Sequence, residues 1–196
     1  MNFLAHLYLS GSNDQVRVGN FSGDSYRRSQ LADLAPDMRK GVELHWFIDQ
    51  FTDTHEIVEE SKALIRPVYR KYAPVLVDIF YDHFLAFHWK NYSELPLADY
   101  AQEQYAVLYA HWDILPTRVR HLLPYMKRYD WLTNYAHFEG IDRVLKGMGR
   151  RAKFESRMEE GVRELKQFHS ELESHFFAFF PLLERASETF LAEYQP

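Results

Sequence analysis

Histidines and aspartates recur at helical spacing within the first 90 residues. His45, Asp49 and Asp53 follow one another at intervals of four in LHWFIDQFTD. Asp78 and Asp82 repeat that interval in VDIFYDHFLAFHW. Residues four apart lie one above the other on an α-helix, so each set could share a face. Imidazole and carboxylate ligands together suit a divalent ion of the manganese, iron, zinc or magnesium group, which can activate water. The spacing therefore predicts a metal-dependent hydrolase.

Six residues form the predicted metal-ligand set, and three of them are also candidates for catalysis. The ligand candidates are His6, Asp24, His45, Asp49, Asp82 and His83, and the catalytic candidates are Asp24, Asp82 and His83. An ionised carboxylate among apolar neighbours, as Asp49 is, needs a metal, a cation or several hydrogen-bond donors. The alternatives are a polar helix face carrying His45 and Asp49, and a buried hydrogen-bond pair formed by Asp82 and His83.

The segment GNFSGDSYRR combines a small-residue strip with charged side chains. Gly19 and Gly23 lie about one helical turn apart, so another helix or a substrate could approach the backbone just before Asp24. Ordinary helix packing with Asp24 in solvent is the alternative. Arg27 and Arg28 could bind a phosphate or a carboxylate, or form a solvated surface.

Composition restricts the class of protein. Hydrophobic residues make up 46% of the 196 residues and charged residues 26%, values typical of a globular chain. The net charge of −5 argues against nucleic-acid binding. Cysteine is absent, so metal ligands must come from His, Asp or Glu. The N-terminus lacks the pattern of a signal peptide, and no apolar run is long enough for a membrane span. We expect a soluble, cytoplasmic protein.

The apolar pattern is helical throughout, without a convincing alternating strand. We predict one all-α domain over residues 1–196, a bundle of about seven to nine helices. Prolines at Pro36, Pro67, Pro74, Pro96, Pro116 and Pro124 are expected at helix ends, and Pro181 should kink or split the last helix. The expected helices are 3–9, 14–28, 36–54, 56–72, 75–90, 97–113, 117–136, 138–148 and 155–192.

Motifs along nearly the whole chain resemble the acyl carrier protein phosphodiesterase family. They are the opening MNFLAHL, GNFSGD, IDQFTD, the DHFLAFHW block from Asp82 to Trp89, YDWLTNY and FFAFFP near the C-terminus. The resemblance implies an all-α fold related to HD-type metal-dependent phosphohydrolases. The order in this chain is Asp82-His83 rather than His-Asp, so the HD signature is not literally present.

The resemblance also implies a reaction. The family hydrolyses the phosphodiester that joins 4′-phosphopantetheine to a serine of acyl carrier protein, with Mn²⁺ as the favoured ion. The carrier protein is small and acidic, so docking would use basic residues such as Arg27 and Arg28. Two alternatives remain open: a helical metallo-phosphohydrolase acting on a nucleotide or another small phosphodiester, and a module that binds carrier protein without cutting it. The sequence does not predict an oligomeric state.

Overall fold

The computed structural model describes residues 1–195, and this range holds helices but no β-strand. The all-α prediction of about seven to nine helices is therefore confirmed: the described range holds eleven α-helices, of which eight have seven or more residues and α1, α8 and α10 are shorter. The helices are α1 Phe3–Tyr8, α2 Asp14–Ser22, α3 Pro36–Thr54, α4 Glu56–Tyr69, α5 Ala73–Phe87, α6 Leu97–Ala110, α7 Thr117–Arg128, α8 Trp131–Asn134, α9 Phe138–Gly149, α10 Val162–Gln167 and α11 His169–Glu193. Short 3₁₀ turns lie at η1 Gly23–Ser25, η2 Arg28–Asp33, η3 Arg70–Tyr72, η4 Trp89–Asn91, η5 Trp112–Ile114 and η6 Met158–Glu160.

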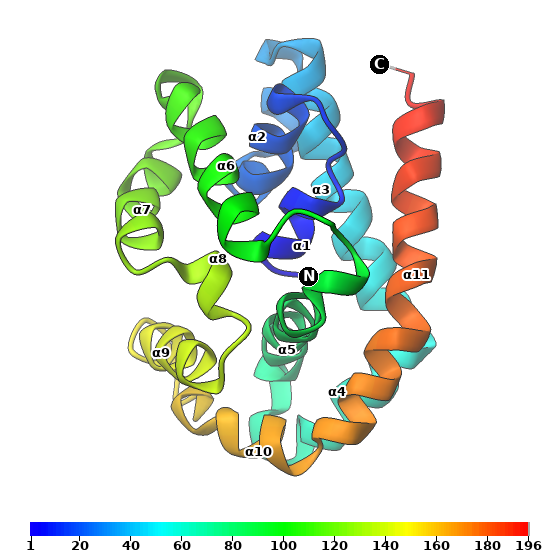
Figure 1. Ribbon diagram of the computed structural model, residues 1–196, viewed down its shortest axis with the longest axis vertical. Helices are drawn as coiled ribbons and strands as arrows, with labels where there is room; N and C mark the ends of the chain where they lie inside the picture. The colour runs from blue at the N-terminus through cyan, green and yellow to red at the C-terminus, as the bar shows by residue number, and fades with distance from the viewer. Residues whose placement is uncertain (196) are drawn as a thin grey trace.

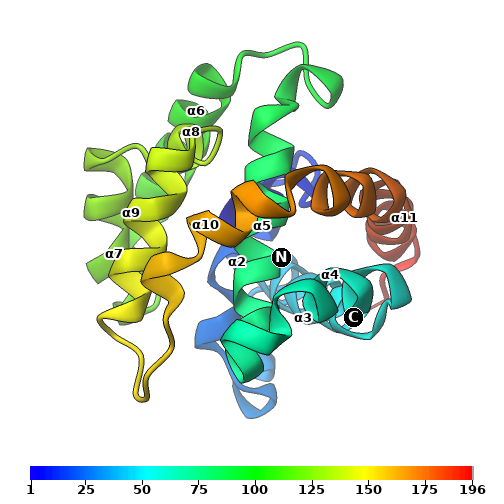
Figure 2. The ribbon, with the colours of Figure 1, turned by 90° about the horizontal axis from the view of Figure 1, so that it is seen from below.

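Helix α5 runs through the middle of the molecule. Helices α6 to α9 lie on one side of it, and α3, α4 and α11 lie on the other (Figures 1 and 2). Eleven of its 15 residues are buried, as expected for a helix that is apolar nearly all round. Buried apolar residues from α1 to α11 join in one hydrophobic core around it. None of the helices in residues 1–195 is long and apolar enough to cross a membrane.

Helices α2 and α3 pack against each other at very short range. A Cβ atom on Gly19 would lie 2.3 Å from the Met38 carbonyl oxygen, and one on Gly41 would lie 2.2 Å from the Val16 carbonyl oxygen. Only glycine fits at these two positions. The strip beginning at Gly19 therefore faces a neighbouring helix rather than a substrate, and the close contact places the end of α2 beside the middle of α3.

Local signals set the ends of the helices near the predicted site. The Asn13 side chain accepts hydrogen bonds from the backbone N–H groups of Gln15 and Val16, which caps α2. Pro36 begins α3, where its missing N–H costs nothing. The predicted helix over 36–54 matches α3.

Three predicted helices are wrong in extent. The helix expected over 117–136 is divided into α7 and α8, because Asp130 between them takes a left-handed conformation with φ of 42°. The helix expected over 14–28 ends at Ser22, because the chain tightens into η1 and becomes extended at Tyr26 and Arg27. The helix expected over 155–192 is divided into η6, α10 and α11. Arg157 takes a left-handed conformation with φ of 53°, which an α-helix does not allow.

Prolines mark helix starts less regularly than predicted. Pro36 and Pro74 lie in first turns, and Pro96 and Pro116 directly precede helices, as expected. Pro67 and Pro124 instead lie inside α4 and α7. Pro181 does not split α11, which continues from His169 to Glu193 and changes direction along its length (Figure 1).

Candidate metal centre

A pocket of about 260 Å³ lies where α1, α3, α5 and η1 meet. Four carboxylates, two imidazoles and one amide line it together with apolar side chains. The polar residues are Asn2, His6, Asp24, His45, Asp49, Asp53 and Asp78, and the apolar ones are Met1, Phe3, Phe21, Val75, Ile79 and Met148. Three of the predicted ligands, one on α1 and two on α3, approach one another closely inside this pocket.

His6, His45 and Asp49 form a compact cluster whose ligand atoms all lie within 4.8 Å of one another. His6 Nε2 is 3.2 Å from one Asp49 carboxylate oxygen, and His45 Nε2 is 3.2 Å from the other. The two imidazole rings stack, with centroids 4.1 Å apart. The interval of four along α3 brings His45 and Asp49 to one face, as predicted from their spacing.

The two Nε2 atoms are buried, and although each lies 3.2 Å from an Asp49 oxygen, neither makes a well-aligned hydrogen bond among the described residues. An unpaired polar atom in the interior is costly, so a pair of them aimed at one carboxylate calls for a ligand. Two neutral imidazole nitrogens and a carboxylate oxygen are the donors that manganese, iron and zinc accept in proteins. The cluster therefore fits a divalent metal ion.

Burial and charge act in opposite directions on the cluster. Burial, reinforced by the neighbouring His45 ring, lowers the pKa of His6 to about 4. Burial also opposes protonation of His45, but the carboxylates of Asp24 and Asp49 outweigh it and raise the pKa of His45 to about 9. Burial would raise the pKa of Asp49, yet the two histidines hold it below its ordinary range. Without a metal, the cluster thus keeps a proton on His45 at neutral pH.

Asp24 and Asp78 also line the pocket. Asp24 in η1 is 70% exposed, and one of its oxygens is 3.4 Å from His45 Nε2. The interaction with His45 lowers its pKa. Asp78 on α5 pairs with the Met1 amino group at 2.9 Å, and that nitrogen lies 3.7 Å from Asp49 Oδ1. Burial raises the pKa of Asp78 to about 6 despite this ammonium group.

Glycine also makes room for the His45 ring. A Cβ atom on Gly23 would lie 2.4 Å from both Cβ and Cγ of His45, so any side chain there would displace the imidazole. Gly23 begins the turn that carries Asp24. The GNFSGD segment therefore positions Asp24 and His45 relative to each other.

Asn20 contacts both histidines and was not predicted as a site residue. Its Oδ1 lies 2.8 Å from His6 Nδ1, and its backbone oxygen lies 2.7 Å from His45 Nδ1. The residue is fully buried at the last turn of α2. The available signal was an amide side chain directly after Gly19 in the GNFSGD segment, from which only the two glycines and Asp24 were considered.

The structure does not bring Asp82 into the cluster. Its carboxylate accepts hydrogen bonds from the backbone N–H groups of Asn2, Leu4 and Ala5, at 3.1, 2.7 and 3.4 Å. These are donors that a helix start leaves free, so Asp82 caps α1 from α5. Burial raises the pKa of Asp82 to about 7, while the Met1 ammonium and these N–H groups oppose the rise.

His83 likewise points elsewhere. Its Nδ1 pairs with the Tyr135 carbonyl oxygen at 2.8 Å, and its ring packs between the rings of Phe87 and Phe138. Burial lowers the pKa of His83 to about 4. Adjacent positions on a helix point about 100° apart, so His83 cannot share the direction of Asp82. Neither residue lines the pocket that holds His6 and His45.

Arg27 and Arg28 are exposed and follow the turn that carries Asp24. The backbone N–H of Arg27 donates to Gln30 Oε1, and the Arg28 guanidinium carbon lies 5.8 Å from the centre of the Trp46 ring. Both arginines are therefore exposed in the segment that follows Asp24.

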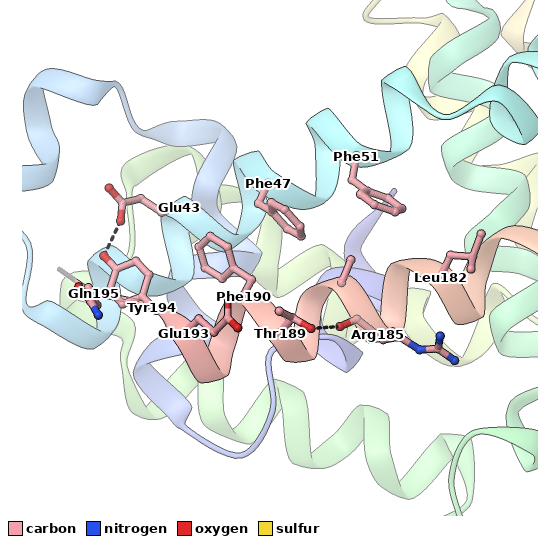
Figure 3. Close-up of a pocket in the computed structure, with 11 residues that line it drawn as sticks. Glu43, Phe47, Phe51, Leu182, Arg185, Thr189, Phe190, Glu193, Tyr194 and Gln195 are labelled. Carbon is pink, nitrogen blue, oxygen red and sulfur yellow. Dashed lines mark hydrogen bonds between the residues drawn. The ribbon is translucent and has the colours of Figure 1, made fainter.

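A larger cavity of about 840 Å³ lies on the other side of α3, between α3 and α11 (Figure 3). Phe47, Phe51 and Phe190 form its apolar wall, and Tyr194 donates a hydrogen bond to Glu43 at one end. Its lining residues include no histidine. The groove therefore lacks the donor set found in the smaller pocket, which remains the candidate site for chemistry.

No solved structure matches this chain significantly, so the implied HD-like arrangement stays a prediction. Curated relatives do match, and the proteins from three bacteria are each named acyl carrier protein phosphodiesterase. The protein from Yersinia enterocolitica is 31% identical over 93% of this chain and 95% of the relative. The proteins from Klebsiella pneumoniae strain 342 and Enterobacter sp. strain 638 are 33% and 34% identical, over 96% and 92% of this chain and 98% and 94% of theirs.

The model of the family described as acyl carrier protein phosphodiesterase matches residues 1–183. This range includes every side chain of the candidate metal centre and the turn that leads to Arg27 and Arg28. The chain belongs to the acyl carrier protein phosphodiesterase family.

Proposed function

We propose that this protein hydrolyses the phosphodiester bond that joins 4′-phosphopantetheine to a serine of acyl carrier protein. The observation that carries the proposal is the convergence of His6, His45 and Asp49 in a pocket of a chain that matches this family over residues 1–183. The relatives' name gives the substrate. The products would be the carrier protein with a free serine hydroxyl and 4′-phosphopantetheine.

His6, His45 and Asp49 would hold one divalent ion, and we propose that it is Mn²⁺. Their two nitrogen donors and one carboxylate suit that ion, and the donors are buried on one side and open to the pocket on the other. When bound, such an ion polarises a phosphoryl oxygen and lowers the pKa of water. Asp82 and His83 were also predicted as ligands, but Asp82 caps α1 and His83 pairs with the Tyr135 carbonyl, so neither would hold the ion.

Asp24 would accept the proton of the attacking water. Its carboxylate is mostly exposed, lies at the pocket beside His45, and has a lowered pKa that keeps it ionised. A carboxylate in that place can accept a proton as the water oxygen bonds to phosphorus. The bond between phosphorus and the serine oxygen then breaks, and the serine oxygen takes up a proton. No covalent enzyme intermediate is needed.

Arg27 and Arg28 would bind the carrier protein. They are exposed directly after the turn that carries Asp24, so an acidic protein bound to them would bring its modified serine near the pocket. Opposite charges at the edge of an interface mainly accelerate association and select the partner. The pocket is also lined by Phe3, Phe21 and Met148, which would offer apolar contact area to the rest of the substrate.

Mass spectrometry of holo acyl carrier protein tests this function. Incubation with the purified protein and Mn²⁺ should remove the whole phosphopantetheine group and leave unmodified carrier protein. The Asp24→Ala variant should bind metal but not catalyse this loss. An unchanged carrier-protein mass would contradict the proposal. Cleavage of nucleotides or simple phosphodiesters alone would favour a small-molecule phosphohydrolase, and binding of carrier protein without cleavage would favour a non-catalytic module.

A further inference from the structure

Asn20 contacts the Nδ1 atoms of both histidines of the candidate metal centre. Its side-chain oxygen faces His6 Nδ1 at 2.8 Å, and its backbone oxygen faces His45 Nδ1 at 2.7 Å. We propose that Asn20 is a positioning residue that fixes both imidazoles in the Nδ1–H tautomer and so leaves both Nε2 lone pairs free for the metal. The inference rests on the proposed metal centre and not on the substrate.

The neighbours of Asn20 decide which way its amide points. The Ser10 hydroxyl donates to the His6 carbonyl oxygen at 2.6 Å, so toward Asn20 it can only accept. The Asn20 NH₂ group donates to that hydroxyl oxygen at 2.9 Å and to the His6 carbonyl oxygen at 2.8 Å. Turning the amide over would place its oxygen against the His6 carbonyl oxygen, which cannot donate, and the Ser10 hydroxyl could donate to it only by giving up its own bond to that carbonyl. The carbonyl end of Asn20 therefore faces the His6 ring.

The amide orientation then determines the His6 tautomer. A carbonyl oxygen only accepts, so the His6 nitrogen that faces it must carry the hydrogen. In a neutral imidazole the other nitrogen, Nε2, then holds the lone pair, and it is this atom that lies 3.2 Å from Asp49. A metal-binding histidine commonly donates its second nitrogen's hydrogen to such an oxygen, which fixes the ring and strengthens the donor.

The backbone of Asn20 does the same for His45. Asn20 lies in the last turn of α2, where carbonyl groups lack partners within the α-helix. Its oxygen accepts from the Gly23 N–H and faces His45 Nδ1. The close packing at Gly19 and Gly41 brings this turn against α3. One residue thus reaches the first histidine through its side chain and the second through its backbone.

Because the Asn20 side chain contacts His6 and its backbone contacts His45, a side-chain substitution can be tested with His45 as an internal control. Asn20→Leu removes the acceptor for His6 and keeps the backbone oxygen for His45. Long-range ¹H–¹⁵N spectra of the imidazoles should show His6 as a single Nδ1–H tautomer in the metal-free wild-type protein. In the variant His6 should give mixed tautomers, while His45 in the Zn²⁺-loaded protein keeps its Nδ1–H. The affinity for Zn²⁺, a diamagnetic probe, should fall about 10- to 100-fold.

His83 reports on folding in the same spectra, because its Nδ1 pairs with Tyr135 outside the site and should not change. An Nε2–H tautomer of His6 in the wild-type protein would overturn the inference even if Asn20→Leu failed to fold. Unchanged His6 signals and unchanged Zn²⁺ affinity in a folded variant would also overturn it. Since neither measurement uses carrier protein, failure of the proposed hydrolysis would be seen separately.

Discussion

The proton held by His45 links metal binding to pH. Its raised pKa of about 9 means that His45 is protonated at neutral pH in the metal-free protein, whereas a metal ligand must be the neutral imidazole. Binding of a divalent ion at pH 7 should therefore release about one proton. Affinity should rise about tenfold per pH unit from 7 to 9 and then level off, because His45 is already neutral above its pKa.

Calorimetric titration of the ion in buffers with different ionisation enthalpies measures this proton release. His45→Ala is the matched control, because it removes the titrating ligand and should remove the pH dependence together with much of the affinity. A flat affinity of the wild-type protein between pH 7 and 9 would be inconsistent with His45 as a ligand.

Asp82 offers a second residue-scale prediction, because a metal ligand and a helix cap respond differently to substitution. Asp82→Asn keeps an oxygen that can accept from the N–H groups at the start of α1, so metal content should stay close to that of the wild type. Asp82→Ala leaves those buried donors unpaired and should lower the free energy of unfolding by about 1–2 kcal/mol. Chemical denaturation and metal analysis of both variants check this, and metal loss in a stable Asp82→Asn protein would restore Asp82 as a ligand.

Local spacing was enough to predict part of the site. The interval of four between His45 and Asp49 lies within one helix, so it fixes their common face. His6 reaches the same point from another helix, which the sequence could suggest only through its residue type. Asp82 was predicted as a ligand but lies outside the cluster, and Asn20 was not predicted, because a buried carboxylate and a buried amide find their partners through tertiary contacts that spacing along the chain does not reveal.

At the scale of elements, the contact between α2 and α3 is what brings the site together. Gly19→Ala would put a methyl group 2.3 Å from the Met38 carbonyl oxygen, so the helices must separate. We expect the variant to lose about 1–3 kcal/mol of stability and also to bind metal more weakly, because α2 carries Asn20 and leads to Asp24. Thermal unfolding and metal titration measure the two effects.

Gly147→Ala is the matched control for this substitution. It lies in α9, where a Cβ atom would meet nothing within 4 Å, so helix propensity alone should make the variant about 0.5–1 kcal/mol more stable. Equal stability and equal metal affinity in Gly19→Ala and wild type would show that the contact between α2 and α3 is less restrictive than these distances indicate.

The helices were predictable to the extent that local patterns determine them. Helix α3 was predicted with its correct ends, because Pro36 marks the start and apolar residues recur along one face. The segment after residue 155 was not, since a left-handed Arg157 and a turn before His169 interrupt an otherwise helical pattern. These two interruptions of the helix depend on how neighbouring helices pack. Neither Arg157 nor Phe168 is a glycine or a proline, so the sequence gives no local indication that the helix ends there.

At the scale of the whole molecule, charge is unevenly distributed. The chain carries a net charge of −5, yet two exposed arginines, Arg27 and Arg28, follow the turn that carries Asp24. Replacing Arg27 and Arg28 with Glu should raise KM for carrier protein with little change in kcat, and the wild-type kcat/KM should fall as salt rises. Charges at the surface are screened beyond roughly 8 Å at physiological ionic strength. Steady-state kinetics over a salt series measures both effects.

A small phosphodiester substrate should respond much less to this charge reversal, because it presents no acidic protein surface to be repelled. Arg118→Glu, an exposed reversal on α7 away from the pocket lining, is the control and should leave KM nearly unchanged. Equal losses with carrier protein and with the small substrate would assign Arg27 and Arg28 to the reaction itself rather than to docking.

The most direct test of the metal centre is a crystal structure of the Mn²⁺-loaded protein with anomalous data collected on either side of the manganese edge. We expect one strong anomalous peak within about 2.0–2.3 Å of His6 Nε2, His45 Nε2 and an Asp49 oxygen, and no such peak in crystals of Asp49→Ala soaked in the same way. A peak held by Asp53 and Asp78 without the histidines, or no peak at saturating Mn²⁺, would contradict the assignment of these three residues as the metal centre.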